Sequence, residues 1–387
     1  SNSKFIQQSS QQSPQRQAMA DNFLIEEKIV TLQKSAMENV TVMAGIDRGC
    51  SLTKVLFVTA GNSDDTFKLH LALFNNTHFE AGLDYLASKA ILQRGEGGKL
   101  HVTGVGCDRY RELIQEKLGL ELEFIDEFLS QTRGAHWLIK NLPIEELCYP
   151  ETEADLGQIT GRAENPLQAN MNQQFQLSSE DVASATPSLP CLFCFIGSAG
   201  GVIFLKENGE SYLVTSLWMA GKSFLGFGKM LLGTSSYDEI MRLAERGRRG
   251  NIDNEGRDLV QTGVDGPYGR MPASLPIFPF GKAVDLELER NKCSKEDLAA
   301  SMVAAFVTNL INLLSTSAKM TDTRSIFLGG NFFRDPFMRQ EMLRQQHFFQ
   351  MQSLNVHYLI TGHTGAVGAM ISEPTDAQRY LKFGKPT

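Results

Sequence analysis

The chain has 387 residues, of which 42% are hydrophobic and 21% charged, and its formal net charge is −7. This length and composition fit about two or three soluble globular domains. The negative charge argues against a nucleic-acid surface as the main function, and no segment approaches the roughly 18 consecutive apolar residues of a membrane span. With no signal peptide expected either, we predict a cytoplasmic protein without nucleic-acid or membrane partners.

The N-terminal 38 residues differ from the rest of the chain. Residues 1–20 are rich in Gln and Ser, which predicts a disordered tail. Residues 21–38 carry apolar side chains at helical spacing, which predicts an accessory helix on the domain or a contact with a partner. These side chains are Phe23, Ile25, Ile29 and Leu32.

From residue 39, two apolar runs flank a polar turn, which predicts two strands and the start of an N-terminal domain over residues 39–148. The Asp47 carboxylate suits a hydrated Mg²⁺ ion. Gly49 lets a ligand approach the backbone closely, and Ser51 and Lys54 can contact phosphate oxygens. An ordinary hairpin with solvated charges is the alternative.

Further strands and helices are expected along this domain. A Gly-rich turn at 104–106 leads into a helix that carries Glu112, and another helix is expected to begin at Asp126-Glu127. Strands are expected at 68–74, 100–103 and 120–124. Helices are expected at 81–93, from about 108, and from Asp126-Glu127 to about 141. Residues 149–188 are rich in Gln, Asn, Ser, Glu and Pro with few aliphatic residues, which indicates an insertion or linker.

The second half repeats this order, so a C-terminal domain is predicted over residues 189–375, followed by a tail at 376–387. Ser294 followed by acidic residues predicts the start of a long helix. Strands are expected at 192–196, 202–205, 212–217 and 326–328, and helices after 221–226, from 294 to about 319, and near 363–368. Two similar α/β halves would face each other across a cleft that binds a nucleotide.

Cysteines are few and scattered, which fits reduced cytosolic thiols better than a disulfide framework. Cys191 and Cys194 have the spacing of metal ligands, but no second Cys or His pair accompanies them. They lie in an apolar run, so two small thiols in a buried strand are predicted rather than a zinc site.

Eight short motifs occur in order over most of residues 43–372. They are Asp47-x-Gly49-x-Ser51-Leu52-x-Lys54, Thr103-Gly104-Val105-Gly106-Cys107 with Glu112, Asp126-Glu127, Ile196-Gly197-Ser198, Gly221 to Gly226, Ser294 to Ala299, Gly330-Asn331-Phe332-Phe333-Arg334 and Gly365-Ala366-Val367-Gly368-Ala369. In this order they resemble the eukaryotic-type (type II) pantothenate kinases of the acetate kinase, sugar kinase, Hsp70 and actin superfamily.

The resemblance implies two ribonuclease H-like (actin-like ATPase) domains facing each other across a nucleotide cleft. It implies transfer of the ATP γ-phosphoryl group to pantothenate, giving 4'-phosphopantothenate, the first step of coenzyme A biosynthesis. Glu112 would be the catalytic base, with ATP and Mg as cofactors and Asp47 holding Mg through water. A homodimer formed through the helix that begins at Ser294, and inhibition by acyl-CoA, are also implied.

Site residues follow motif by motif from the same resemblance. Nucleotide contacts are implied for Asp47, Gly49, Ser51, Lys54, Gly197, Ser198, Gly221, Lys222, Ser223, Gly226, Gly330 and Asn331. Substrate contacts are implied for Ser198, Gly201, Gly365 and Ala366.

Several positions depart from the family pattern. Cys50, Val105, Ala220 and Lys222 stand where the family has Gly. Gly201 stands in place of a substrate-contacting Ser, and Leu213 in place of an Arg that helps to hold the substrate carboxylate. Loss of that Arg removes a charge-assisted contact worth roughly 1.5–3 kcal/mol. An inactive or weakly active nucleotide-binding paralogue with a regulatory role, or a kinase for another small hydroxyl compound, therefore stays open.

Overall fold

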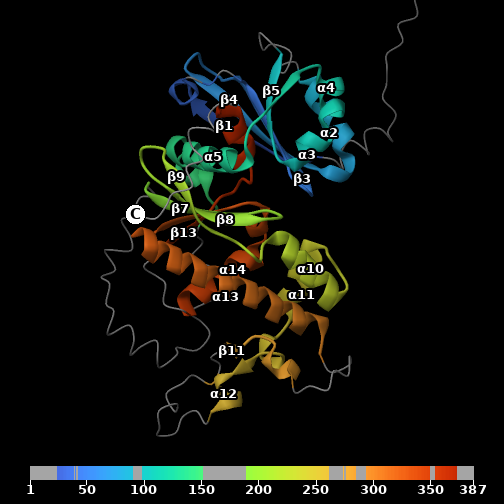
Figure 1. Cartoon of the computed structure of the whole chain (residues 1–387), viewed down its shortest axis with the longest axis vertical. Coiled ribbons are helices and arrows are strands. Elements are labelled where there is room, and N and C mark those ends of the chain that lie inside the picture. Colours follow the sequence, from blue (N-terminus) through green and yellow to red (C-terminus); the bar gives the residue numbers. More distant parts are fainter. Residues whose placement is uncertain are drawn as a thin grey trace, which may run out of the picture. The chain divides into compact units, whose positions relative to one another are not determined.

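The structure is a computed structural model that describes residues 24–38, 40, 42–89, 98–150, 189–260, 273, 276–284, 293–348 and 354–372. It contains two compact units, shown in Figure 1. Unit 1 consists of Ser1–Trp137 and His363–Arg379, and unit 2 of Leu138–Gly362 and Tyr380–Thr387. The predicted tails at 1–20 and 376–387, and most of the insertion at 149–188, lie outside the described residues.

Unit 1 is built on a six-stranded sheet in the order β1-β4-β3-β2-β5-β6. The strands are β1 (Leu24–Gln33), β2 (Ala44–Arg48), β3 (Leu52–Ala60), β4 (Thr66–Asn75), β5 (Lys99–Thr103) and β6 (Glu121–Phe124). In this order, β1, β4, β3 and β2 pair antiparallel with their neighbours, and β2, β5 and β6 pair parallel. Short turns suffice for antiparallel neighbours, whereas helical crossovers separate the parallel ones.

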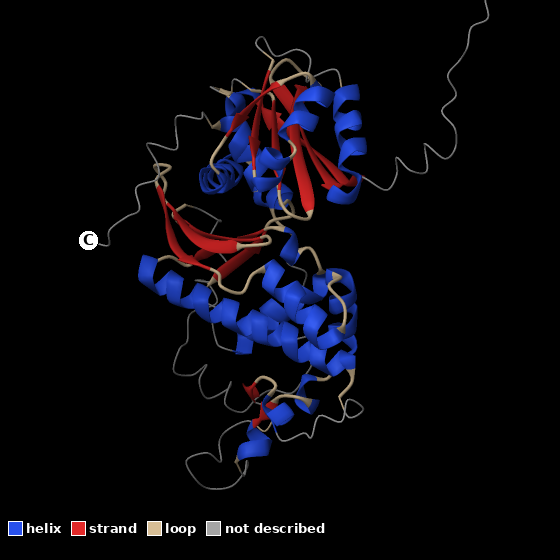
Figure 2. Ribbon diagram, turned by 45° about the vertical axis from the view of Figure 1, so that its right-hand side comes forward, coloured by secondary structure: helices blue, strands red, loops and turns tan. Residues whose placement is uncertain are grey.

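Helices cover both faces of this sheet, as Figure 2 shows. They are α2 (Phe79–Ser88), α3 (Val105–Arg109), α4 (Arg111–Leu118), α5 (Glu127–Asn141, which ends in unit 2) and α15 (Thr364–Ile371), with short 3-10 turns η1 (Lys34–Met37) and η2 (Asn76–His78). Ile46 and Val102 pack with α2 and α4 in one core cluster. Because strand residues alternate between faces, their neighbours Asp47 and Thr103 point to the opposite face, the face that α15 covers.

The accessory helix predicted for residues 21–38 is wrong, because most of this segment is strand β1. It pairs antiparallel with β4 along nearly its whole length. Val30 and Leu32 are buried at strand spacing, whereas Ile25 and Ile29, which suggested the helix, are about half exposed. Pairing with the edge of β4 therefore outweighs the helical spacing of a few apolar side chains in this segment.

The last helix, α15, belongs to unit 1, although its sequence position placed it in the predicted domain 189–375. Glycines allow its close approach to β2 and α5. A Cβ on Gly45 would lie 2.2 Å from the Ala366 carbonyl oxygen, and one on Gly134 would lie 1.8 Å from the Thr364 carbonyl oxygen. Packing rather than chain order thus assigns α15 to the first sheet.

Unit 2 contains a five-stranded sheet in the order β13-β12-β7-β8-β9. Its strands are β7 (Cys191–Ile196), β8 (Gly200–Leu205), β9 (Ser211–Ser216), β12 (Ser325–Gly329) and β13 (Asn355–Tyr358). Strands β7, β8 and β9 are antiparallel, and β7, β12 and β13 are parallel. Apart from β1, both sheets therefore have the strand order third, second, first, fourth, fifth, which confirms the prediction of two ribonuclease H-like domains.

Unit 2 also contains six helices among the described residues. They are α6 (Ile144–Leu147), α10 (Gly221–Leu232), α11 (Tyr237–Arg246), α12 (Gly256–Leu259), α13 (Lys295–Thr321) and α14 (Pro336–Phe348). A short ribbon, β10 (Asn254–Glu255) with β11 (Pro276–Phe278), and the 3-10 turns η3 (Arg249–Asn251), η4 (Gly281–Val284) and η5 (Asn331–Phe333) complete the unit. Cys191 and Cys194 are buried in β7, as predicted.

Helix α13 begins where the sequence predicted, with the Ser294 side chain accepting a hydrogen bond from the Asp297 N–H. By length and composition it could cross a membrane, but 56% of its most apolar stretch is buried inside the protein. Its buried side chains, including Val303 and Leu314, join the core of unit 2. The helix therefore has the character of a core helix.

Candidate active site

The hairpin of β2 and β3 places an acidic and a basic side chain together in unit 1. Asp47 is 2% exposed, and Lys54 is its register partner on β3. The Lys54 Nζ lies 3.3 Å from the Asp47 Oδ2. Burial of Asp47 excludes the alternative of an ordinary hairpin with solvated charges, because a carboxylate leaves water only where partners stabilise it.

The turn of this hairpin is held by its own hydrogen bonds. The Gly49 N–H donates to the Leu52 carbonyl at 3.1 Å, and Asn76 Nδ2 donates to the Gly49 carbonyl at 2.9 Å. The Gly49 amide is therefore used inside the turn. Ser51 is exposed at the tip, where its hydroxyl and amide are open to a phosphate.

Two helices complete the surroundings of Asp47. Gln131 on α5 has its Nε2 3.5 Å from the Asp47 Oδ2, and its Oε1 accepts a hydrogen bond from the Thr364 hydroxyl at the start of α15. Sequence reasoning missed both Gln131 and Thr364, since nothing local distinguishes them from ordinary helix residues. They orient the carboxylate of Asp47.

Gly365 lies against this carboxylate. A Cβ at this position would be 2.5 Å from the Asp47 Oδ2 and 2.7 Å from the Gln131 Nε2, so no larger residue fits without displacement. Ala366 is completely buried and packs α15 on β2. The predicted substrate contacts of Gly365 and Ala366 stay predictions.

We expect Gly365→Ala to lower the free energy of unfolding by about 1–3 kcal/mol, because the added methyl group forces Asp47 or Gln131 to move. Gly226→Ala is the matched control. Gly226 lies within α10, and a Cβ there would have no atom outside its own stretch of helix within 4 Å, so alanine should stabilise the helix by about 0.5–1 kcal/mol. Urea unfolding measures both changes. Equal effects of the two substitutions would contradict the tight packing at Gly365.

A second carboxylate, Glu127, lies at the start of α5. The preceding Asp126 caps the helix by accepting the Leu129 N–H at 2.8 Å. Glu127 is one helical turn before Gln131 and shares its face. Partial desolvation raises the pKa of Glu127, the negative charge of Asp47 raises it further, and Lys54 opposes both. The two residues of the Asp126-Glu127 motif therefore have separate roles: Asp126 caps α5, and Glu127 lies near Asp47.

These residues fit a magnesium site of the water-mediated kind. Among the described residues, no group of three or more His, Cys, Asp or Glu side chains could enclose a metal ion. Mg²⁺ commonly binds one or two carboxylates, several waters and substrate phosphates rather than a closed protein cage. Asp47 with nearby Glu127 supplies that donor set.

The predicted base, Glu112, is exposed in the first turn of α4. The Gly-rich turn before it packs on Arg48, since a Cβ on Gly106 would lie 2.5 Å from the Arg48 Nη1. The Arg48 guanidinium lies between the rings of Phe79 and Tyr110, at 4.2 and 4.1 Å from their centroids. Arg48 therefore links the β2 end to the residue immediately before α4.

His363 precedes α15 and is buried, with its Nε2 2.9 Å from the Ala72 carbonyl oxygen. Burial lowers its pKa from 6.5 to about 4, and the positive charge of Lys54 adds to this effect. The folded protein holds this imidazole neutral, whereas the unfolded chain takes up a proton below about pH 6.5.

The free energy of unfolding should therefore be unaffected by this group above pH 6.5. As the pH falls from 6.5 toward 4, it should decrease by up to about 1.4 kcal/mol per pH unit. Urea unfolding at pH 7, 6 and 5 measures this, with His363→Asn as the comparison. The difference between the two proteins should shrink as the pH falls, and a constant difference would contradict the prediction.

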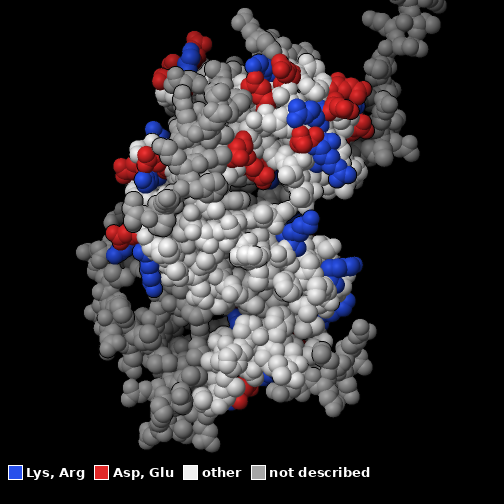
Figure 3. All heavy atoms as spheres, in the orientation of Figure 1, with Lys and Arg blue, Asp and Glu red and all other residues white. Residues whose placement is uncertain are grey.

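Unit 2 contains the second predicted phosphate turn, between β7 and β8. The Gly197 N–H donates to the Ala199 carbonyl at 2.8 Å, and the amides of Gly221 and Lys222 donate to the carbonyls of Gly197 and Ser198, both at 3.0 Å. The start of α10 thus rests on this turn. These three amides are occupied, which leaves the Ser198 hydroxyl and the Lys222 ammonium, both on exposed residues, to contact a ligand. In Figure 3, Lys and Arg side chains lie at the surface near α10 and α11.

The end of β12 lies beside the same turn. Gly330 has φ +100°, and a Cβ there would be 2.2 Å from the Ile196 carbonyl oxygen. Asn331 follows, and its buried Nδ2 donates to no acceptor among the described residues. An unsatisfied buried donor is costly, so a ligand acceptor at this position would compensate it. Ser223, another predicted nucleotide contact, donates from its hydroxyl to the Trp218 carbonyl at 3.4 Å.

Gly201 and Leu213 form an apolar surface on neighbouring strands. Gly201 is buried on β8, and a Cβ there would lie 3.1 Å from the Leu213 Cδ1. Leu213 on β9 is 39% exposed. Gly201 stands where the family pattern has a Ser hydroxyl, and Leu213 stands where it has an Arg guanidinium. Both positions are therefore apolar in this chain.

Two ribonuclease H-like units, each with a Gly-containing turn after its first strand, define the class of actin-like ATPases and sugar kinases. Within this class, the family model named Fumble matches residues 43–372, so the chain belongs to the Fumble family, the type II pantothenate kinases.

Among curated proteins, the chain is 26% identical over 310 residues to a mouse (Mus musculus) protein named 4'-phosphopantetheine phosphatase, with 79% of this chain and 34% of that protein covered. It is 25% identical over 340 residues to pantothenate kinase 1 of Oryza sativa subsp. japonica, with 85% and 47% covered. The chain thus spans between a third and a half of the length of these relatives.

Among solved structures, the activator of the 2-hydroxyisocaproyl-CoA dehydratase from Clostridium difficile, with bound ADPNP, is similar at a TM-score of 0.45 and 18% identity. The match covers 89% of this chain and 99% of that one.

Proposed function

We propose that the chain transfers the γ-phosphoryl group of ATP to the primary hydroxyl of pantothenate and forms 4'-phosphopantothenate, the first step of coenzyme A biosynthesis. The observation that carries this proposal is the buried Asp47, held by Lys54 and Gln131 at the first phosphate motif of a Fumble-family chain. Relatives named pantothenate kinase support the choice of substrate.

The residues of the chain contribute mainly position and charge, as expected for phosphoryl transfer. Mg²⁺ bound with ATP would neutralise phosphate charge, and Asp47 would help to hold it. Lys54 and the Ser51 hydroxyl contact phosphate oxygens. Glu112 accepts the proton of the substrate hydroxyl while the hydroxyl oxygen forms its bond to the γ-phosphorus and the bond from that phosphorus to the ADP oxygen breaks.

A second candidate function rests on Leu213 and Gly201. Their apolar surface lacks the hydroxyl and the cation that the family pattern provides for pantothenate. A different small hydroxyl compound, or a regulatory role with weak activity, would fit that surface. The nucleotide part of the proposal is the same in each case.

Phosphoryl transfer from radiolabelled ATP distinguishes these candidates. Pantothenate is compared with pantetheine and a panel of sugars, in the presence of Mg²⁺. Label in pantothenate supports the first function, and label only in another compound supports the second. ATP binding without transfer to any acceptor supports the regulatory role.

Three further features belong to this proposal: a homodimer formed through α13, inhibition by acyl-CoA and a cytoplasmic location. Size-exclusion chromatography with light scattering measures the oligomeric state. Adding acetyl-CoA to the transfer assay measures the inhibition.

A further inference from the structure

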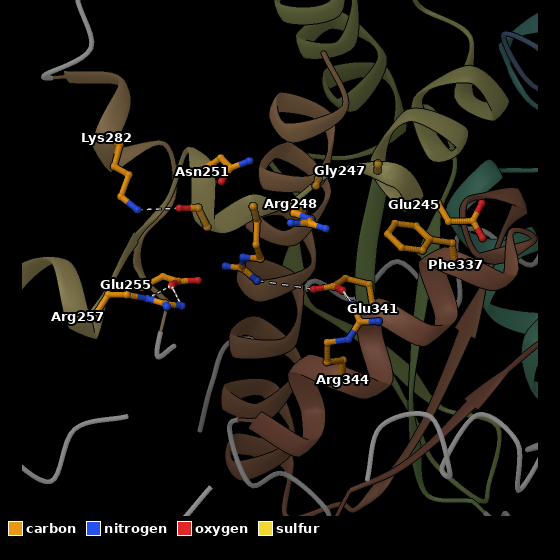
Figure 4. Close-up of a pocket in the computed structure, with 14 residues that line it drawn as sticks. Glu245, Gly247, Arg248, Asn251, Glu255, Arg257, Lys282, Phe337, Glu341 and Arg344 are labelled. Carbon is orange, nitrogen blue, oxygen red and sulfur yellow. Dashed lines mark hydrogen bonds and ion pairs between the residues drawn. The ribbon is translucent and has the colours of Figure 1, made fainter. Parts of the chain in front are cut away.

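A cavity of about 720 Å³ lies within unit 2, apart from the residues assigned to the candidate active site. Its walls come from α11, η3, α12, η4, α13 and α14, and Figure 4 shows the side chains that line it. Small-molecule sites typically measure about 300–1,000 Å³. The cavity is therefore large enough for a metabolite rather than only for an ion.

Basic side chains outnumber acidic ones in this lining, although the whole chain is acidic. The basic residues are Arg248, Arg249, Arg257, Lys282 and Arg344, and the acidic residues are Glu245, Glu255 and Glu341. Four of the five cations are arginines, whose planar guanidinium matches phosphate and carboxylate oxygens.

Two of the three lining carboxylates already accept hydrogen bonds or ion pairs. Glu341 is 4% exposed and pairs with Arg344 and with Arg249, whose Nη1 is 3.7 Å from its Oε1. Glu255 accepts the Arg257 Nε at 2.7 Å. Because each guanidinium has five N–H groups, these pairs leave donors in excess.

The Arg249 side chain is held in place by a buried carboxylate. Its Nε donates to the Asp253 Oδ2 at 2.8 Å. Asp253 is completely buried, and its other oxygen accepts the Ser301 hydroxyl and, at 3.0 Å, the Phe280 N–H. The guanidinium is thus positioned before any ligand arrives, which lowers the entropic cost of binding.

Arg248 differs from the other lining cations. Its backbone N–H donates to the Asp297 Oδ1 at 2.7 Å, so the loop that carries it is anchored to α13. Its side chain is exposed, and the ion pairs of the described residues include none with its guanidinium. Figure 4 shows it between Asn251 on one side and Phe337 on the other.

We propose that this cavity binds a phosphate-bearing small molecule, with Arg248, Arg249 and Arg344 contacting the phosphate oxygens. Phe337 together with Ala244 supplies an apolar wall for the remainder of the ligand. No residue assigned to phosphoryl transfer lines the cavity, so this proposal is independent of the proposed function.

Isothermal titration calorimetry of the whole chain in EDTA tests the proposal with pyrophosphate, AMP and adenosine. Pyrophosphate and AMP should bind, and adenosine, which lacks phosphate, should bind at least tenfold more weakly than AMP. Arg248→Ala should weaken pyrophosphate and AMP about tenfold or more, because a charge-assisted contact is lost. This variant removes no ion pair of the described residues, and circular dichroism checks its fold.

Arg242→Ala is the matched control, since Arg242 is exposed on α11 and does not line the cavity. It should bind both phosphates as the unchanged protein does. Three results would overturn the proposal: neither phosphate binds at millimolar concentration, Arg248→Ala binds as tightly as the unchanged protein, or Arg242→Ala loses as much affinity as Arg248→Ala. Loss of AMP binding in Asp47→Asn but not in Arg248→Ala would also overturn it, because AMP would then occupy the candidate active site.

Discussion

Replacing Asp47 with Asn is expected to lower kcat for phosphoryl transfer about a hundred- to a thousandfold. Asparagine keeps the size of the side chain, so Gln131 and Gly365 stay packed against it. The negative charge that pairs with Lys54, and that we propose orients Mg²⁺-bound water, is lost. Removing one preorganised electrostatic contact from a water-excluded site has typical effects of this size.

Steady-state kinetics over a range of Mg²⁺ concentrations measures this effect, and electron paramagnetic resonance of Mn²⁺ measures metal binding without turnover. Asp108→Asn is the control, because Asp108 is 72% exposed and pairs only with Arg111 among the described residues. Both measurements should be unchanged in this control. An Asp47→Asn protein with ordinary kcat at saturating Mg²⁺ would exclude the proposed role of Asp47.

Strands β2 to β9 and β12, and helices α2, α4, α5, α10, α13 and α15, could be predicted because local signals and tertiary packing agree there. Strand β13 and helices α11 and α14 were not predicted. Apolar runs of strand length lie in the interiors of both sheets, and Gly-rich turns follow β2, β5 and β7 as expected. Ser294 also identified the first residue of α13 correctly, since capping depends only on neighbouring residues.

What could not be predicted depends on contacts between distant residues. Ile25 and Ile29 suggested a helix, but the unpaired edge of β4 selected a strand. Gln131 and Thr364 are 233 positions apart and meet only after α15 packs on unit 1. Gly49 and Gly197 were predicted to contact the nucleotide, and their backbone amides donate to carbonyl groups within the turns. The motifs therefore predict which turns form the candidate site, but not which of their atoms already have hydrogen-bond partners within the protein.

Glu112→Gln is expected to affect the catalytic step, and Glu127→Gln is expected to affect metal binding. A general base contributes about 10²- to 10⁴-fold, so Glu112→Gln should lower kcat by that factor and leave Mn²⁺ binding unchanged. Glu127 lies near Asp47 and Lys54. Glu127→Gln should therefore weaken Mn²⁺ binding, and saturating Mg²⁺ should restore most of its kcat.

The pH dependence of kcat/KM provides a second measure of the same distinction. The pKa of Glu127 is raised by partial desolvation and by Asp47, so its deprotonated form decreases at a higher pH than that of an ordinary Glu. If Glu127 were the base, the acid limb of the profile would lie above the usual Glu range and would disappear in Glu127→Gln. We expect Glu127→Gln to leave the acid limb in place, because Glu127 is not the proposed base. Glu116→Gln, an exposed change one turn further along α4, should leave the profile unaltered.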